Sequence, residues 1–190
     1  MDLARRAARI LKLRPTVLPL PQELPVRGFD PQTLAQQLAA LEYPGFAYLR
    51  AARKRNPAEV LLTALAQDNL ESRLAEALPW LLLHYPDMNR EWLVQQARLW
   101  NLSNRLGFMV TLAREVLANR GQETSDRHKT LLQFEDQLQE SRLDREDTLC
   151  QSSLSAPERE WLRQTRPPEA LHWHLLTDWR PEHLQYAAEA

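Results

Sequence analysis

Two stretches of similar sequence, 32 positions apart, are the strongest guide to the fold: Asn69-Leu-Glu-Ser-Arg-Leu-Ala75 and Asn101-Leu-Ser-Asn-Arg-Leu-Gly107. Upstream of them, Glu59 and Leu61 recur as Glu91 and Leu93 at the same offset. A period of about 30–45 residues with two helices per unit is typical of α-solenoids, in which each hairpin buries one face on its neighbour. Six identities can also arise by chance, so the repeat is a hypothesis.

The composition favours helix throughout the chain. Of 190 residues, 44% are hydrophobic and 26% charged, and only 4 are glycine. Leu, Ala, Arg, Glu and Gln are good helix formers, and the β-branched residues that favour strands are rare. We therefore expect an all-α fold of short helical hairpins, stacked in a HEAT-like α-solenoid or in an irregular bundle.

Cap and breaker residues set the expected helix bounds. Asp30-Pro31, Asn56-Pro57 and the capping box Ser155-Ala-Pro-Glu158 each predict a helix start. Arg120-Gly121 predicts a helix end. The helices expected from these signals and from apolar spacing cover 3–13, 31–41, 46–55, 57–67, 69–85, 90–99, 102–119, 124–145, 156–165, 169–177 and 181–189.

These elements suggest three parts. Residues 1–30 combine a basic helix with a proline-rich strap, residues 31–121 form the helical-repeat core, and residues 122–190 form a polar helical arm with C-terminal helices. The strap carries prolines at 15, 19, 21, 25 and 31, which forbid a regular helix. Its apolar members, among them Leu18, Leu20 and Phe29, indicate that it lies across a surface, either of this protein or of a partner.

The 6 tryptophans divide into two groups. Trp80, Trp92 and Trp100 fall in the repeat region and are expected in the core. Trp161, Trp173 and Trp179 lie in the C-terminal third, where they are candidate docking residues because binding energy concentrates in Trp, Tyr and Arg. The alternative for these three is that they pin the tail onto the main bundle.

Charge is unevenly spread. Residues 1–55 carry ten Lys/Arg and four Asp/Glu, whereas residues 56–190 carry fourteen and twenty-one. The basic side chains could contact phosphates, although a solvated face, or pairing with the acidic second half of the chain, is the simpler interpretation. The candidate nucleic-acid-binding residues are Arg5, Arg6, Arg9, Lys12, Arg14, Arg50, Arg53, Lys54 and Arg55.

No catalytic or cofactor motif is present in the sequence. It lacks Gly-x-Ser-x-Gly, His-Glu-x-x-His, Cys-x-x-Cys and a glycine-rich phosphate loop. His172 and His174 are two apart, a spacing that points the rings of a helix away from each other and argues against zinc. We therefore expect no enzyme activity, no cofactor and no metal site.

Other features bear on location. No apolar run approaches the roughly 20 residues of a membrane span, and residues 1–13 make a poor signal peptide. The one cysteine, Cys150, fits a reducing compartment and has no evident partner base. We expect a cytoplasmic protein without membrane contact.

Residues 56–117 resemble a protein family. The stretch Leu78-Pro-Trp-Leu-Leu-Leu-His-Tyr-Pro-Asp-Met-Asn-Arg-Glu-Trp-Leu93, continuing to Asn104-Arg-Leu-Gly-Phe108 and Leu112-Ala-Arg114, is similar to a helical segment of antitoxins from bacterial toxin–antitoxin pairs. The resemblance implies a neutralising subunit with a protein partner. The DNA-binding region of an autoregulating antitoxin is not evident here.

The leading hypothesis is thus a non-catalytic protein-binding module, such as an antitoxin-like subunit that neutralises or scaffolds a toxin or another complex subunit. One alternative is a nucleic-acid-associated regulator that uses the basic N-terminal region. A second is an enzyme with no recognisable motif.

Overall fold

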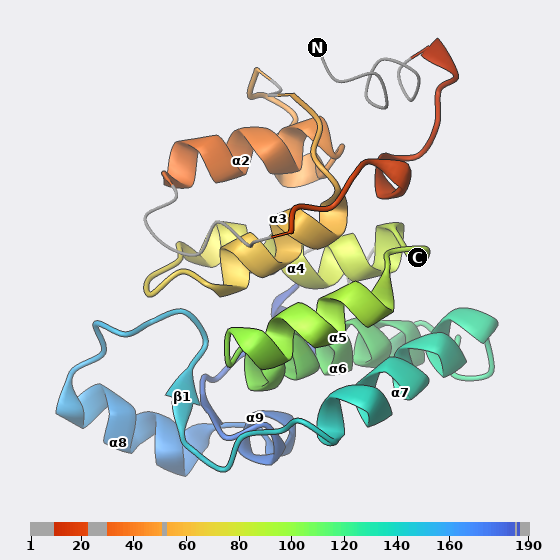
Figure 1. The fold of residues 1–190 in the computed structure, drawn as a ribbon. Helices are drawn as coiled ribbons and strands as arrows, with labels where there is room; N and C mark the ends of the chain where they lie inside the picture. The colour runs from red at the N-terminus through yellow and green to blue at the C-terminus, as the bar shows by residue number, and fades with distance from the viewer. Residues whose placement is uncertain (1–9, 23–29, 51–52, 185, 187–190) are drawn as a thin grey trace. The chain divides into compact units, whose positions relative to one another are not determined.

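Eight α-helices dominate the part of the chain that the computed structural model describes, which is residues 10–22, 30–50, 53–184 and 186. They are α2 (Pro31–Ala40), α3 (Pro57–Leu65), α4 (Ser72–His84), α5 (Arg90–Leu99), α6 (Ser103–Asn119), α7 (Asp126–Gln139), α8 (Ala156–Thr165) and α9 (Pro168–His172) (Figure 1). Short 3₁₀ turns occupy η1 (Pro15–Val17), η2 (Pro44–Phe46) and η3 (Pro181–His183). The prediction of a mostly helical fold is confirmed.

One short strand pair accompanies the helices. β1 (Asp147–Thr148) pairs in parallel with β2 (Leu175–Leu176), with Asp147 opposite Leu175 and Thr148 opposite Leu176. The sequence did not predict these strands, because a two-residue pairing between distant segments leaves no alternating pattern to read. Among the described helices, none is both long and apolar enough to cross a lipid bilayer.

The chain divides into two compact units, Met1–Asn89 and Arg90–Ala190. This division differs from the expected parts 1–30, 31–121 and 122–190. The strap is tied into the first unit by hydrogen bonds from Asn56, and α6 packs along α7 within the second unit. A boundary near residue 121 would separate two helices that share one core.

The N-terminal unit is built around α3. Every residue of this helix is buried, and the core extends to Leu38 of α2 and Leu78 of α4. Asn56 caps α3, since its Oδ1 accepts a hydrogen bond from the amide of Ala58 at 3.0 Å. Asp30 caps α2 in the same way, so both predicted helix starts are confirmed.

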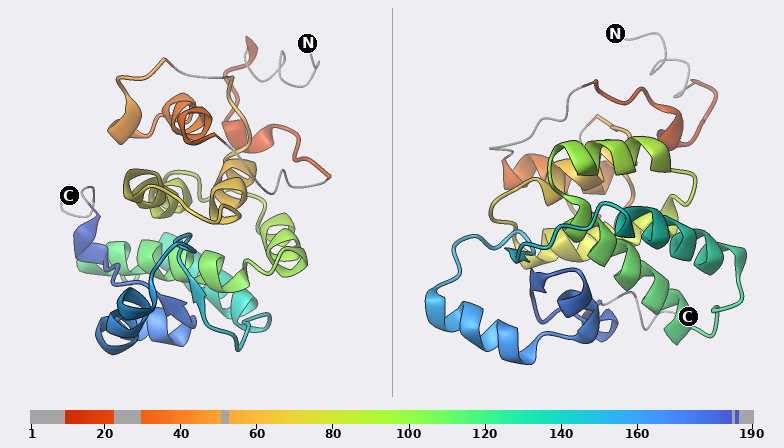
Figure 2. Two further views of the ribbon diagram at one scale, coloured as in Figure 1. Left: turned by 90° about the vertical axis from the view of Figure 1, so that its left-hand side faces the viewer. Right: turned by 60° about the horizontal axis from the view of Figure 1, so that its bottom comes forward.

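The C-terminal unit is organised by α6, which is buried along most of its length. Gly121 follows the end of α6 and has a φ of +69°, the left-handed conformation that glycine adopts without strain. It therefore stops the helix at the predicted position. The chain then returns as α7, which lies beside α6 in the views of Figures 1 and 2 and places Phe134 and Leu138 in the core.

Each unit contains a helical hairpin, α3–α4 in the first and α5–α6 in the second. An offset of 32 positions carries the bounds of α3 close to those of α5 and the start of α4 close to that of α6. Asn69 and Asn101 both lie in the connecting loops. This correspondence fits the predicted repeat, but a solenoid stack of the hairpins is not confirmed.

Some expected helices differ from the structure. The helix expected over 46–55 is absent from its described residues, where η2 is followed by turns and extended chain. Asn56 precedes Pro57 and has ψ of 130°, and a residue before proline is disfavoured in the α region. The helix expected over 169–177 ends at His172 because β2 follows, and of 181–189 only η3 is helical in the described part.

Candidate partner-binding surface

The helix α8 carries Trp161, and its start is fixed by its own sequence. The backbone amide of Ser155 donates to Glu158 Oε2 at 2.7 Å, the return half of a capping box. Hydrogen bonds from the Ser155 side chain and backbone hold the pKa of Glu158 below its ordinary value. Pro167 and Pro168 follow the last turn and stop the helix. In Figures 1 and 2, α8 lies at the edge of the C-terminal unit.

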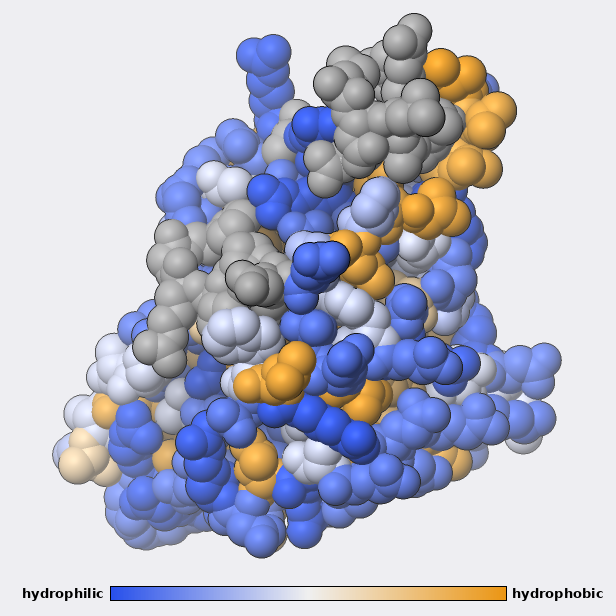
Figure 3. All heavy atoms as spheres, viewed as in Figure 1, coloured by the Kyte–Doolittle hydropathy of each residue, from blue (hydrophilic) through white to orange (hydrophobic). Residues whose placement is uncertain are grey.

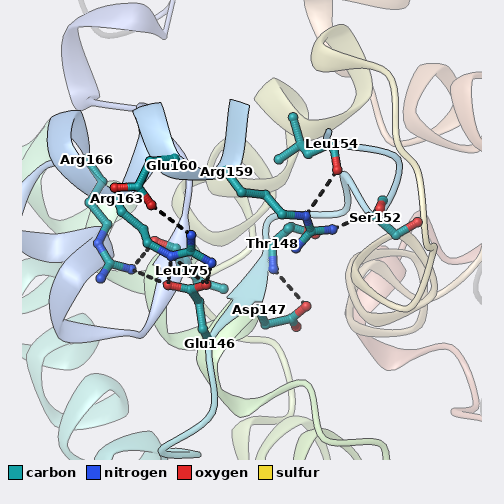
Figure 4. Close-up of polar contacts among 10 residues, drawn as sticks. All are labelled: Glu146, Asp147, Thr148, Ser152, Leu154, Arg159, Glu160, Arg163, Arg166 and Leu175. Atoms are coloured by element: carbon teal, nitrogen blue, oxygen red, sulfur yellow. Dashed lines mark hydrogen bonds and ion pairs between the residues drawn. The ribbon is translucent and has the colours of Figure 1, made fainter. Parts of the chain in front are cut away.

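Three arginines spaced at i, i+4 and i+7 attach α8 to the segment before it and to β2. Arg163 makes a forked contact with Glu146, with Nη2 2.7 Å from Oε1 and Nε 3.1 Å from Oε2. Arg166 donates to the carbonyl of Leu175 at 3.1 Å. Arg159 donates to the carbonyls of Leu154 at 3.1 Å and Ser152 at 2.9 Å. In Figure 4, Arg163 and Arg166 extend toward Glu146, whereas Arg159 extends toward Leu154 and Ser152.

The carboxylate of Glu146 is the centre of this network. The hydrogen bond from Arg163 is the main reason that its pKa lies below the ordinary value; burial opposes the shift, and the charges of Arg163 and Arg166 add to it. The pKa of Arg163 is raised by the same contact and by Glu160. Both groups are therefore charged at neutral pH, and the fork fixes orientation as well as position.

The segment that bears Glu146 is itself anchored to α6. Arg105 Nε lies 2.8 Å from Asp147 Oδ2, and its Nη2 donates to Oδ1 at 3.0 Å. Burial lowers the pKa of Arg105, but the hydrogen bond to Asp147 and the charge of its carboxylate, together with the contact with Cys150, outweigh it, so the pKa is raised overall. Cys150 is fully buried, with Sγ 3.6 Å from Arg105 Nη1, and is therefore a structural thiol in this structure.

Trp161 lies on the opposite side of α8 from the arginines. Successive residues are about 100° apart around a helix, so Trp161 and Gln164 face away from the side that holds Arg159, Leu162 and Arg163. Leu162 is 5% exposed whereas Trp161 is 55% exposed. Trp161 therefore exposes part of a large amphipathic side chain on a helix whose opposite side is attached to Glu146 and Leu175.

Trp173 has the opposite environment, and its prediction as a docking residue needs correction. Its side chain is fully buried against Gly107 of α6, and its Nε1 donates to Thr111 Oγ1 at 2.9 Å. It pins the C-terminal segment onto α6, which was the alternative expectation. Trp179 is half-buried. The neighbouring His172 packs edge-on against Trp173 and contacts Gln139 Oε1 at 2.7 Å.

The tryptophans of the repeat region are less buried than expected. Trp80 and Trp92 are half-buried, and Trp100 at the end of α5 is 39% exposed. Trp80 stacks on His84 with ring centroids 4.4 Å apart. Helical periodicity places these residues on apolar faces, but part of each ring remains exposed in the structure.

The described part of the strap lies on its own unit. Asn56 Nδ2 donates to the carbonyls of Thr16 at 3.0 Å and Leu18 at 2.7 Å, and Thr16 Oγ1 donates to Asp87 at 2.7 Å. Leu18 is buried and is therefore not a free docking residue, whereas Leu20 is half-buried. Phe29 lies outside the described residues.

Ahead of this anchored segment, apolar side chains are exposed. Ile10, Leu11, Leu13 and Val17 are each about half to two-thirds exposed, and Figure 3 shows apolar atoms gathered over this part of the strap. This part of the strap therefore has an apolar surface that is accessible to a partner.

Three of the candidate nucleic-acid-binding residues form ion pairs with acidic side chains. Arg14 pairs with Asp87, Lys54 with Glu42 and Arg55 with Glu59, at 3.0, 2.7 and 2.8 Å. Lys12, Arg50 and Arg53 are exposed. Arg5, Arg6 and Arg9 lie outside the described residues. For three of the nine, pairing with nearby acids is therefore the observed role.

Two further features of the described residues bear on metal or small-molecule binding. Within them, no three His, Cys, Asp or Glu side chains lie close enough to hold a metal ion. A depression of about 420 Å³ lies between α5 and α7, lined by Glu91, Val94, Gln95, Arg98, Leu99, Gln137 and Glu140. Arg98 and Glu140 pair across it at 3.3 Å, and no nucleophile lines it.

Comparison of the chain with protein-family models, with curated proteins and with solved structures found no match. The network behind Trp161 was not foreseen, although the spacing of Arg159, Arg163 and Arg166 on one helical face is the signal that could have revealed it.

Proposed function

We propose that this chain is a non-catalytic protein-binding module whose main docking residue is Trp161. The observation that supports this is that Trp161 is 55% exposed on a helix whose opposite side is held by the Arg163–Glu146 ion pair. Tryptophan is enriched among residues that dominate binding energy. A side chain presented on a fixed element loses less conformational entropy on binding, so more of its contact energy appears as affinity.

The surroundings of Trp161 suggest the chemistry of the partner. Its carboxylate neighbours are already engaged, Glu158 with Ser155 and Glu160 with Arg163 and Gln164. The charge of Glu160 is thus paired with Arg163, whereas Glu158 is hydrogen-bonded to the neutral Ser155 and keeps its negative charge on this face. A partner that fits this face has an apolar pocket for the ring and a polar rim that includes hydrogen-bond donors, as protein interfaces commonly do.

Within this proposal, the chain is an antitoxin-like subunit that neutralises or scaffolds a partner protein in the cytoplasm. The resemblance of residues 56–117 supports the antitoxin-like role, and the stacked hairpins of a helical repeat would be the rigid platform. The exposed apolar side chains of the strap, residues 10–17, would add a second contact.

The experiment is affinity capture of the full chain from its native host, followed by a binding titration with the purified partner. Replacing Trp161 with Ala removes the indole from an exposed position, where substitutions change folding stability by about 0.5 kcal/mol or less. We expect Trp161→Ala to weaken binding by about 2 kcal/mol, which is roughly thirtyfold in Kd. Trp161→Phe should lose less.

A matched control is Leu132→Ala on α7, where another large apolar side chain is exposed by 44%. Its Kd should equal that of the unchanged chain. An unchanged Kd for Trp161→Ala would refute the assignment of Trp161, and an equal loss in both variants would show a nonspecific apolar effect.

A further inference from the structure

The loop after α2 presents aromatic and cationic side chains together, and its conformation is fixed by packing on α4. Tyr43 is buried, with its ring centroid 5.3 Å from that of Trp80 and 5.6 Å from that of Phe46. Gly45 permits this arrangement, because a Cβ there would stand 2.5 Å from a Tyr43 ring carbon. The loop therefore has a defined shape before any ligand binds.

Tyr48 projects from this fixed loop and is 69% exposed. Arg73, in the first turns of α4, places its guanidinium carbon 5.9 Å from the Tyr48 ring centroid and 5.5 Å from that of Phe46. Its Nη2 also donates to the carbonyl of Gly45 at 3.3 Å. The stacked guanidinium holds the ring while leaving most of its surface in solvent.

Two exposed arginines follow Tyr48 along the chain. Arg50 and Arg53 form no ion pair with another described residue, in contrast to Lys54 and Arg55, which pair with Glu42 and Glu59. Arg73 lies against the exposed Tyr48 ring, and Arg50 and Arg53 follow it within five residues of the chain. An exposed aromatic ring with several guanidinium groups near it along the chain is a combination that suits single strands, because bases stack on the ring and cations contact phosphates.

We propose that Tyr48, Arg50, Arg53 and Arg73 form a binding surface for single-stranded nucleic acid on the N-terminal unit. A base stacks on the Tyr48 ring beside the Arg73 guanidinium, and Arg50 and Arg53 contact the flanking phosphates. The carboxylates of an acidic polypeptide would satisfy the arginines, but Asp and Glu side chains have no ring to stack on Tyr48, whereas every nucleotide carries both a phosphate and a base, so the exposed ring favours nucleic acid. Trp161 is not part of this surface. The inference therefore holds whether or not Trp161 binds a protein partner.

The test is fluorescence anisotropy with the full chain and labelled RNA and DNA strands of one sequence, roughly 12 nucleotides long, a length within the site sizes of single-strand binders. We expect binding that weakens with salt. Tyr48→Ala should lower affinity at least about fivefold, and Tyr48→Phe should retain it. Arg50→Gln and Arg53→Gln should each reduce the slope of log K against log salt by about 0.7. RNA and DNA arms show which sugar the surface prefers.

Arg14→Gln is the matched control, since it removes the same charge from a side chain that pairs with Asp87, and it should leave the salt slope unchanged. Circular dichroism checks that each variant is folded. The proposal is overturned if neither strand binds at about 50 mM salt, low enough that phosphate contacts are strong, or if Tyr48→Ala binds as the unchanged chain does. Displacement by poly-glutamate at equal charge concentration would also overturn it, in favour of an acidic polypeptide.

Discussion

The ring of Trp173 lies so close to Gly107 that a Cβ at residue 107 would stand 2.4 Å from two of the ring carbons. This contact lets the C-terminal segment pack directly on the backbone of α6. Glycine is otherwise unfavourable inside a helix by about 1 kcal/mol relative to alanine. Residue 107 therefore trades helix propensity for a close approach of the indole.

Gly107→Ala should destabilise the protein by about 1–3 kcal/mol, the usual cost of forcing an extra carbon into a packed core. The measurement is urea unfolding followed by circular dichroism. In a Trp173→Leu background the obstructing ring carbons are gone, so the same substitution should be neutral or stabilising by up to about 1 kcal/mol because alanine favours helix. A loss of equal size in both backgrounds would contradict the contact.

Asp147→Asn should cost about 3 kcal/mol, because it leaves the buried guanidinium of Arg105 without its counter-charge. Arg105 is 8% exposed and its forked contact with Asp147 fixes the segment that leads to α8. The matched control is Glu140→Gln, which breaks the exposed pair with Arg98 and should cost less than about 1 kcal/mol. If both variants lose the same free energy of unfolding in urea, burial does not make the Arg105–Asp147 pair more stabilising than an exposed pair.

The helices were the most predictable part of this structure, because their starts are local. Asp30-Pro31, Asn56-Pro57 and the Ser155–Glu158 box each begin a helix where expected. The loop at 46–50 was mistaken for helix because its apolar residues have helical spacing. In the structure, Phe46 instead packs on Tyr43, an interaction that depends on α4 and cannot be read locally.

The candidate site was predictable only in part. Composition marked Trp161 and Trp173 alike as docking residues, yet one is 55% exposed and the other fully buried. What separates them is tertiary: Gly107 opens a place for one ring, whereas the arginines of α8 turn the other ring outward. Likewise, only the structure shows that Lys54 pairs with Glu42 and that Arg55 pairs with Glu59.

Asn56→Asp separates two tasks of one side chain. The Oδ1 atom caps α3, and Nδ2 donates to Thr16 and Leu18 of the strap. Aspartate is an equally good cap but lacks the two donors, so it places carboxylate oxygen against two carbonyls. We expect helical content to be retained while protease cleavage within residues 14–22 becomes faster. Asn56→Ala should lose the cap as well, at a further cost of about 1 kcal/mol.

For Asn56→Asp, the measurement is limited proteolysis with mass spectrometry, alongside circular dichroism. Asp87→Asn is a useful comparison, since it weakens only the Arg14 and Thr16 contacts at the surface and should accelerate cleavage less. Cleavage at the same rate in all variants would show that the strap is not held by Asn56.

Attachment of α8 should weaken in acid because Glu146 must be charged to hold Arg163. The folded-state pKa of Glu146 is depressed, mainly by the Arg163 hydrogen bond. A depressed pKa means that the contribution is present in full above the unfolded value, about 4.3 for glutamate, and is lost as pH falls through the lower folded value. Glu146→Gln removes this pH-dependent contribution at every pH.

The measurement is the free energy of unfolding of both proteins between about pH 7 and pH 3, a window that spans the glutamate pKa. The difference between them should be constant above about pH 5 and shrink below about pH 4. Glu158 also has a lowered pKa, but its partner Ser155 is the same in both proteins, so its contribution cancels. Glu160 shares Arg163 with Glu146, so both proteins carry Glu160→Gln in this comparison. A difference that stays constant down to pH 3, or grows in acid, would show that the Glu146 charge does not hold α8.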